Sequence, residues 1–444
     1  MKIVHIGTAD NSGGAARASF HLHQGLLRAQ HASSMVVNQQ VEQRPDIDRI
    51  GFPRTLLGKL CERALLKCET WTGLQYLLQP MKNRFLDHPF VRNADIIHLH
   101  NLHGNFFSFT ILPALSKLAP LVWTLHDTWA LTGHCSYTYD CDRWRLGCGH
   151  CPNLREYPEL AIDTTAFLWR RKRESYRNSR ISVVAPSDWL CGMVRASPLF
   201  EGCDVRRIPY GIDLSEFCPG IQQQARQELS IPSDATVIMV IVFADTIAGA
   251  SRKGSAYFKE ALRFLDTKVR PWLLVVGSRG MFRDYDQAFS VREVGFLPAS
   301  KMHQCYVAAD VFVSPTLADN LPLSLLEATA SGTPSVAFGV GGVSDIVRHL
   351  ETGYLAKERD ARDLAYGIQW ILSDRLRRMA LSTECRALAE REYGEDLQVA
   401  RYIDLYGEVL AMNRLHSGGP RSTREAAIPT GKNDFSEHHL SERD

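Results

Sequence analysis

Two successive series of short β-branched segments, separated by amphipathic stretches, constrain the fold of this 444-residue chain more than any other feature. In the first half, residues 15–27 carry apolar side chains at helical spacing. Segments of that half with the composition of buried strands are residues 3–6, 35–37, 95–99, 121–125 and 181–185. Strands that alternate with helices predict parallel sheets built from βαβ units.

The second half repeats this alternation. Strands are expected at residues 237–243, 272–276, 311–313 and 335–338, and helices at residues 256–265, 323–330 and 361–372. Two such series predict an α/β protein with two doubly wound domains, and a ligand cleft beyond the carboxyl ends of their strands.

The composition places the boundaries of these domains. We expect an N-terminal domain at residues 1–200 and a C-terminal domain at residues 201–390, with a hinge near residues 187–219 where proline and glycine gather. Residues 391–416 are expected to form a helix that crosses back to the first domain. Residues 417–444 combine glycine, proline, serine and charged residues with few apolar ones, which predicts a disordered tail.

Charge and hydropathy exclude several classes of protein. With 51 basic and 49 acidic residues the net charge is +2, so we expect no nucleic-acid partner. The first residues lack the apolar core of a signal peptide, and no apolar run reaches the roughly 18 residues of a membrane helix. We therefore expect a cytoplasmic protein whose membrane contact is peripheral, at the inner face of the cytoplasmic membrane.

Residues 56–81 interrupt the alternation with apolar and basic side chains on different faces. One interpretation is an interfacial helix that lies on a membrane. The interpretation we favour from sequence is an ordinary surface helix with its apolar side on the core.

Two loops have the composition of anion sites. Gly13 and Gly14 follow the first strand and open a helix, where backbone amides and the helix dipole favour an anion. Arg252 and Lys253 follow the first strand of the second half and suit a diphosphate. The alternatives are a plain tight turn and a solvated basic loop.

Residues 314–328 are the most informative segment. Asp319 lies in the loop before a helix expected to begin near Pro322, and Glu327 lies more than one turn into that helix. Carboxylates accept hydrogen bonds from hydroxyls, so the pair is suited to two polyol parts of one ligand. The backbone amides of Asn320 and Leu321 are suited to a phosphate. Alternatively, Asp319 is a helix cap and Glu327 a solvated residue.

In this order the segments resemble the retaining nucleotide-sugar glycosyltransferases of GT-B fold, of the bacterial group 1 (family 4) polysaccharide-biosynthesis type. The resemblance covers about residues 1–410 and includes further segments at residues 209–217, 294–296, 309–315, 326–334 and 352–355. It implies two Rossmann-like domains that face each other across a cleft. It also implies transfer of a sugar, with retention of configuration, from a nucleotide diphosphate sugar to a saccharide or lipid-linked saccharide in exopolysaccharide or other cell-surface polysaccharide synthesis.

The resemblance also assigns roles to residues. The family has a Glu-x7-Glu pair whose first acid contacts donor-sugar hydroxyls and whose second contacts the ribose; Asp319 and Glu327 occupy these positions here. His126 is placed beside the donor sugar, where it would orient the sugar and stabilise charge at the reacting carbon. A histidine with only a structural role at a strand end is the alternative.

The implied reaction needs no covalent nucleophile, because the leaving diphosphate helps to deprotonate the acceptor. We expect no catalytic metal, since cations and helix N-termini suffice to stabilise the departing phosphate. Asp127 is the second choice for a base that acts on the acceptor hydroxyl.

A cysteine-rich loop at residues 134–152 follows His126. It contains Cys135, Cys141, Cys148 and Cys151 in the spacing C-x5-C-x6-C-x2-C. Four thiolates in a short loop can close a tetrahedral structural zinc site. Reduced thiols or a redox pair are the alternatives.

Two other functions fit the same architecture. A nucleotide-sugar epimerase would isomerise the donor without any acceptor, and a non-catalytic nucleotide- or sugar-binding protein would bind without transfer. A zinc-containing nucleic-acid module is disfavoured by the balanced charge.

Overall fold

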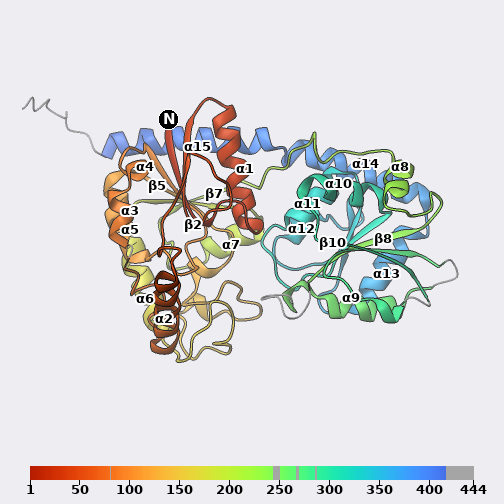
Figure 1. Ribbon diagram of the computed structural model, residues 1–444, viewed down its shortest axis with the longest axis horizontal. Helices are drawn as coiled ribbons and strands as arrows, with labels where there is room; N and C mark the ends of the chain where they lie inside the picture. Colours follow the sequence, from red (N-terminus) through yellow and green to blue (C-terminus); the bar gives the residue numbers. More distant parts are fainter. Residues whose placement is uncertain (81, 244–250, 267–269, 286–287, 417–444) are drawn as a thin grey trace, which may run out of the picture.

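The computed structural model describes residues 1–80, 82–243, 251–266, 270–285 and 288–416. It contains two separate sheets, of seven and six strands, with helices packed around each (Figure 1). All strand pairs in both sheets are parallel. The α/β class with two Rossmann-like sheets is therefore confirmed. The tail expected to be disordered, residues 417–444, lies outside the described residues.

The first sheet has the strand order β3-β2-β1-β4-β5-β6-β7. Its strands are β1 (Lys2–Ala9), β2 (Ala32–Gln39), β3 (Ile47–Arg49), β4 (Ile96–Leu99), β5 (Leu121–Thr124), β6 (Ile181–Ala185) and β7 (Asp204–Arg207). The helices of this half are α1 (Gly14–Arg28), α2 (Leu56–Thr72), α3 (Lys82–Asp87), α4 (Pro89–Arg92), α5 (Leu112–Leu118), α6 (Thr165–Arg177) and α7 (Asp188–Arg195). The order of the strands reverses between β1 and β4, which is where such sheets bind ligands.

The second sheet has the order β10-β9-β8-β11-β12-β13. Its strands are β8 (Val237–Val242), β9 (Trp272–Gly277), β10 (Ser290–Gly295), β11 (Val311–Ser314), β12 (Ser335–Phe338) and β13 (Gly353–Ala356). The helices are α8 (Gln222–Glu228), α9 (Ser255–Leu262), α10 (Ala299–Ala308), α11 (Leu323–Ala330), α12 (Val343–Ile346), α13 (Ala361–Leu372) and α14 (Arg375–Glu392). Here the reversal falls between β8 and β11, and both strands are almost entirely buried, as their apolar runs require.

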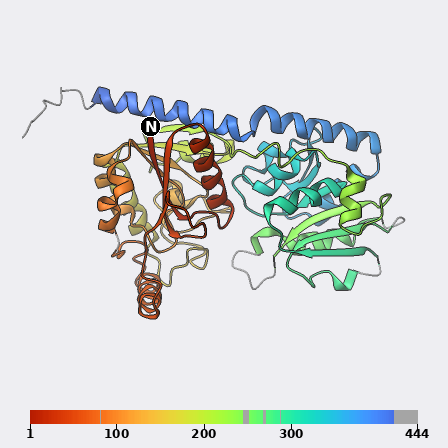
Figure 2. The same cartoon turned by 45° about the horizontal axis from the view of Figure 1, so that its top comes forward.

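The last helix, α15 (Glu395–His416), leaves the second half and packs beside the first sheet (Figures 1 and 2). Tyr402 and Tyr406 of α15 are buried in a cluster that includes Leu22 of α1 and Val122 of β5. The chain thus passes between the halves twice. The two passages are hydrogen-bonded to each other, since Ile212 N donates to Tyr393 O at 2.7 Å and Glu395 N donates to Ile212 O at 3.1 Å.

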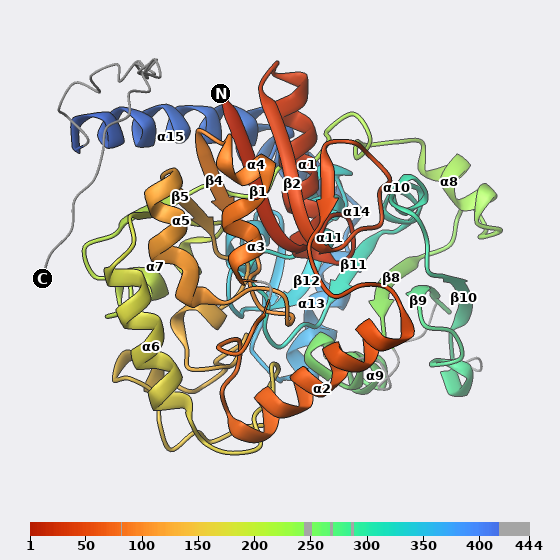
Figure 3. The same ribbon diagram turned by 60° about the vertical axis from the view of Figure 1, so that its left-hand side comes forward.

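The favoured interpretation of residues 56–81, a helix with its apolar side on the core, is wrong. Within α2 only Gly58 and Glu69 are buried. The helix lies on the outside of the first half in all three views, so its leucines have no core to pack on (Figures 1, 2 and 3). Its exposed large apolar side chains are Leu56, Leu57, Leu60, Leu66 and Trp71. No helix among the described residues is long and apolar enough to cross a membrane.

Candidate active site

A cavity of about 620 Å³ opens where the switch points of the two sheets face each other. Residues that follow β1 and β5 line one side, and residues that follow β8 and β11 line the other. The structure brings nine of the ten residues expected from sequence into this lining: Gly13, Gly14, His126, Asp127, Arg252, Lys253, Asp319, Leu321 and Glu327.

A cluster of two cations and one carboxylate forms the second half's side of the cavity. Asp319 Oδ2 accepts hydrogen bonds from Lys253 Nζ at 2.8 Å and from Arg252 Nη1 at 3.2 Å. Burial by itself raises the pKa of Asp319, but the charges of Lys253 and Arg252 outweigh it, so the net pKa is lowered. Gly254 has a φ of 68°, and a Cβ there would lie 1.8 Å from Pro315 O, so only glycine lets the two loops approach this closely.

Glu327 lies in α11 and joins the two halves of the molecule. Its Oε1 accepts a hydrogen bond from Arg17 Nη2 of α1 at 2.7 Å, and its Oε2 accepts one from Tyr306 Oη at 2.8 Å. Burial raises the pKa of Glu327 although Arg17 opposes that shift. Arg17 is not among the residues expected from sequence, although its position in the helix opened by Gly13 and Gly14 was an available signal.

Asn320 is the one expected residue that does not line the cavity. Its side chain instead bridges the two halves: Oδ1 accepts a hydrogen bond from Ser187 Oγ at 2.6 Å, and Nδ2 donates one to Leu125 O at 3.2 Å. Leu321, the next residue, does line the cavity, just before α11 begins at Leu323. Within this loop, Asn320 therefore holds the two halves together and Leu321 forms part of the cavity wall.

His126 lies at the end of a buried chain of hydrogen-bonded rings. Its Nε2 is 3.0 Å from His100 Nδ1, and its Nδ1 is 2.7 Å from Tyr210 Oη. Burial lowers the pKa of His126 to about 4, against the opposing charge of Asp127, so the ring is neutral at physiological pH. Both ring nitrogens are engaged, which makes His126 a neutral part of the cavity wall rather than a source of positive charge.

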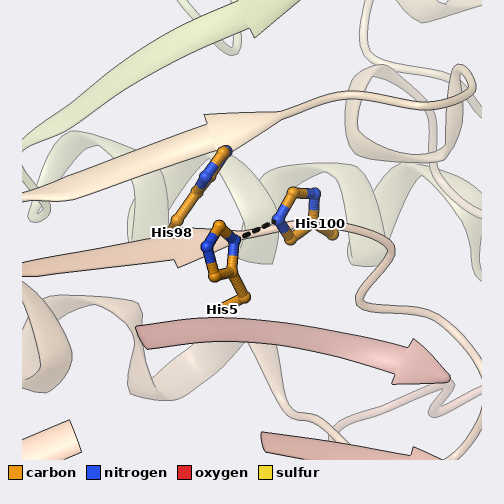
Figure 4. Close-up of side chains that lie close together, drawn as sticks. All are labelled: His5, His98 and His100. Atoms are coloured by element: carbon orange, nitrogen blue, oxygen red, sulfur yellow. Dashed lines mark hydrogen bonds between the residues drawn. The ribbon is translucent and has the colours of Figure 1, made fainter. Parts of the chain in front are cut away.

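Three buried histidines lie close together beside His126: His5 on β1, His98 in β4, and His100 just beyond β4, where it also lines the cavity (Figure 4). His5 Nδ1 lies 3.0 Å from His100 Nε2, and His98 bonds to Thr124 and Tyr406 through its two nitrogens. Their candidate ligand atoms lie within 4.8 Å of one another. Burial lowers the pKa of all three, and of their six ring nitrogens only Nε2 of His5 lacks a partner. His5 and His100 thus continue the hydrogen-bonded chain of neutral rings from His126, and His98 separately ties α15 to the sheet through Tyr406.

Asp127 pairs with a residue that sequence reasoning missed. Its Oδ2 lies 2.7 Å from Nε2 of His103, and its Oδ1 accepts a hydrogen bond from Trp129 N. Burial alone raises the pKa of Asp127, but His103 and these hydrogen bonds lower it overall. Since His103 also lines the cavity, Asp127 holds a ring whose other nitrogen, 3.4 Å from Tyr157 Oη, faces the same space.

The cysteines of the loop that follows His126 do not belong to this cavity. Cys135, Cys141, Cys148 and Cys151 all line a second, much smaller one. The two are connected by the loop itself, because Tyr137 lines the large cavity and its ring lies 4.4 Å from Arg252 Cζ.

Paired Rossmann-like domains with cations, acids and two helix N-termini on a shared cavity define a GT-B glycosyltransferase, and the sequence comparisons agree. The family described as Glycosyltransferase Family 4 matches residues 12–216, and the family described as Glycosyl transferases group 1 matches residues 239–374. The chain belongs to these group 1 (family 4) glycosyltransferases.

Individual relatives are distant. The chain is 23% identical over 355 residues to the colanic acid biosynthesis glycosyl transferase WcaC of Escherichia coli K12, covering 76% of this chain and 83% of that protein. Among solved structures, sucrose-phosphate synthase of Thermosynechococcus elongatus has a TM-score of 0.66 at 18% identity, covering 92% of this chain and 99% of that one. Anabaena HepE, solved with UDP-glucose, has a TM-score of 0.59 at 16% identity, covering 93% and 100%. At these identities the structures show the fold alone.

Proposed function

We propose that this glycosyltransferase takes a sugar from a nucleotide diphosphate sugar and transfers it to a saccharide or lipid-linked saccharide during synthesis of an exopolysaccharide or another cell-surface polysaccharide. The observation that carries the donor assignment is the cluster of Arg252, Lys253 and Asp319 on the cavity wall. The relatives are consistent with it, since WcaC is named for colanic acid biosynthesis and HepE was solved with UDP-glucose.

In this proposal the donor diphosphate lies against Arg252 and Lys253 and competes with Asp319 for their charge. The N-termini of α1 and α11 add backbone amides, at Gly13, Gly14 and Leu321, that favour the same negative charge. Asp319 is then available for hydroxyls of the transferred sugar. Glu327 accepts hydrogen bonds from the ribose hydroxyls while it keeps its contact with Tyr306.

Transfer proceeds with retention of the anomeric configuration. The bond from the anomeric carbon to the diphosphate oxygen breaks, the acceptor oxygen bonds to that carbon on the same face, and the acceptor proton passes to the leaving diphosphate. His126 orients the sugar as a neutral ring. Both oxygens of Asp127 are engaged in hydrogen bonds, so Asp127 acts by positioning His103 on the acceptor side rather than as the base.

The exposed apolar face of α2 suits an acceptor that is anchored to a lipid. Leucines and a tryptophan alternate there with exposed basic side chains, at Lys59, Arg63 and Lys67, which is the composition of helices that lie in a membrane interface. We therefore include peripheral contact with the inner face of the cytoplasmic membrane in the proposal.

A thermal-shift panel of UDP, GDP, ADP and their common sugars tests the donor site. One nucleotide family should raise the melting temperature of the wild type by several degrees, because a ligand that binds only the folded state stabilises it by RT ln(1 + [L]/Kd). Glu327→Ala and Lys253→Ala should abolish the shift. Lys301→Ala, at an exposed lysine of α10 in the same half, should leave it unchanged.

The transfer itself is tested with the donor found in this way. Proton NMR of the first product formed on a saccharide acceptor should show the anomeric configuration of the donor. An inverted anomer would refute retention, and an isomerised donor without acceptor would instead identify an epimerase. Absence of any shift at millimolar nucleotide would refute the donor site.

A further inference from the structure

The loop between the first sheet's fifth strand and α6 is unusually long for one without regular structure. Residues 132–164 contain no strand and no helix except the three-residue turn Arg143–Arg145. Loops of this length inside a compact domain need another source of order. At the base of the loop, Lys172 Nζ of α6 donates hydrogen bonds to Trp129 O at 2.6 Å and to Thr132 O at 3.0 Å.

The next part of the loop contains four cysteines that are grouped around one small cavity. Cys135, Cys141, Cys148 and Cys151 surround one cavity of about 20 Å³, which has room for one small ion. None of them forms a disulfide. The four consecutive residues at 147–150, only two of which are glycine, all have positive φ, between 48° and 108°. That backbone conformation is unfavourable for Cys148 and His150 and persists only where other interactions hold it.

Polar groups contact two of these sulfur atoms. Gly133 N donates to Cys148 Sγ at 3.2 Å, and His134 Nε2 lies 3.4 Å from Cys151 Sγ. His134 Nδ1 carries the ring hydrogen, because its other contact is the carbonyl of Pro158 at 2.9 Å. Nε2 is therefore unprotonated and accepts the hydrogen of the Cys151 thiol, and this is also the tautomer in which a histidine binds a metal.

A buried lysine of α6 lies beside these cysteines. Lys172 is buried, and no carboxylate pairs with it among the residues that the structure describes. Cys148 and Cys135 are the first of its acidic electrostatic neighbours. Burial lowers the pKa of Lys172 to about 7, and its ammonium lies 3.6 Å from the centre of the Trp129 ring, so thiolates on the neighbouring sulfurs would favour its charged form.

We propose that the thiolates of Cys135, Cys141, Cys148 and Cys151 bind one structural zinc ion. Each thiol releases its proton to solvent and forms one bond to Zn²⁺, and no atom is oxidised or reduced. Four thiolates leave the site with a net charge of −2, which Lys172 partly balances. Among the described residues only the three histidines of Figure 4 place three candidate ligand atoms within 4.8 Å of one another, so the four sulfurs draw together when the ion binds.

The ion would also shape the donor cavity. Tyr137 lies between two of the ligands in sequence, and its ring stacks on Arg252. Closure of the cysteine site therefore fixes a ring that covers one of the diphosphate-binding cations. The zinc proposal does not rest on the proposed donor, because metal content is measured without any nucleotide.

The test uses the full chain, purified with a non-thiol reductant and without chelator. Mass spectrometry of the digested protein should find about one zinc per chain. After removal of the metal, Co²⁺ should restore the site and give the thiolate charge-transfer band in the near ultraviolet together with the visible bands of tetrahedral cobalt. Cys148→Ser combined with Cys151→Ser should lose both signals. Cys61→Ser combined with Cys68→Ser, at exposed cysteines of α2, is the matched control and should keep them.

Three results would overturn the proposal: a wild type that holds no zinc and gives no cobalt band, a double variant of the loop that keeps its zinc, or recovery of the loop cysteines as two disulfides after non-reducing digestion. If the double variant does not fold, the cobalt spectrum of the wild type decides the question by itself.

Discussion

Replacement of three leucines on α2 by serine should release the protein from lipid vesicles. Leu56, Leu57 and Leu60 are 77%, 71% and 51% exposed, which together corresponds to about two fully exposed leucine side chains. Complete burial of one leucine contributes about 1.5–3 kcal/mol, so transfer of the three into a membrane interface contributes about 3–6 kcal/mol. The partition coefficient of the triple variant should therefore fall by about two to four orders of magnitude.

The same substitutions should hardly change the fold, because these side chains have few protein partners to lose. Co-sedimentation with phosphatidylglycerol vesicles measures the binding, and the melting temperature reports the fold. The matched control is Leu376→Ser on α14, since Leu376 is also 77% exposed but lies in the other half. Equal sedimentation of wild type and triple variant, or no sedimentation of the wild type, would refute a membrane role for α2.

Three further predictions concern the cavity and its supports. Glu327→Gln should lower the affinity for the donor nucleotide sugar, measured by calorimetry, by about 10- to 150-fold, since hydrogen bonds to a charged group contribute about 1.5–3 kcal/mol. The melting temperature should fall only slightly, because glutamine can still accept a hydrogen bond from Arg17. Acid should destabilise the protein through His126, whose pKa of about 4 in the folded state lies below the unfolded value of 6.5. The unfolded chain then binds more protons between these pH values, so about 3 kcal/mol of stability present above pH 6.5 is lost as the pH falls to 4. His126→Asn should reduce the fall of the melting temperature across this window without removing it, because burial also lowers the pKa of His5, His98 and His100. Asn320→Ala should cost about 1–3 kcal/mol in chemical denaturation, because Ser187 loses its buried acceptor, and an unchanged denaturation midpoint would contradict the assigned bridge.

The interior of both sheets was predictable and the edges were not. Strands such as β8 and β9 are buried on both faces, so their sequences are continuous apolar runs that identify them directly. Four strands were not expected from the sequence, β3, β7, β10 and β13, and each of them is an edge of its sheet. An edge strand pairs on one side only and is partly solvated, as the sequence DVRR of β7 illustrates, so its composition resembles that of a loop.

The site follows a similar division. The residues of the Asp319 loop and of the Arg252 loop could be selected because charge and glycine directly after a strand have few structural reasons to occur. Arg17 had only its place in the helix opened by Gly13 and Gly14 as a signal, and His103 had none, because their importance depends on partners 310 and 24 residues away in the chain, Glu327 and Asp127. The exposure of α2 could not be predicted from periodicity either, because periodicity identifies the apolar face of a helix but not whether another element packs against that face.

The paired passages of the chain between the two halves determine how the cavity can open. Ile212 is hydrogen-bonded to both Tyr393 and Glu395. The two passages of the chain between the halves therefore lie side by side and join the halves at one place. The contacts from Arg17 to Glu327, from Ser187 to Asn320 and from Arg359 to Asp140 also join the two halves. Any separation of the halves would have to break these contacts, whereas the paired passages would keep the two sides of the cavity attached along one edge.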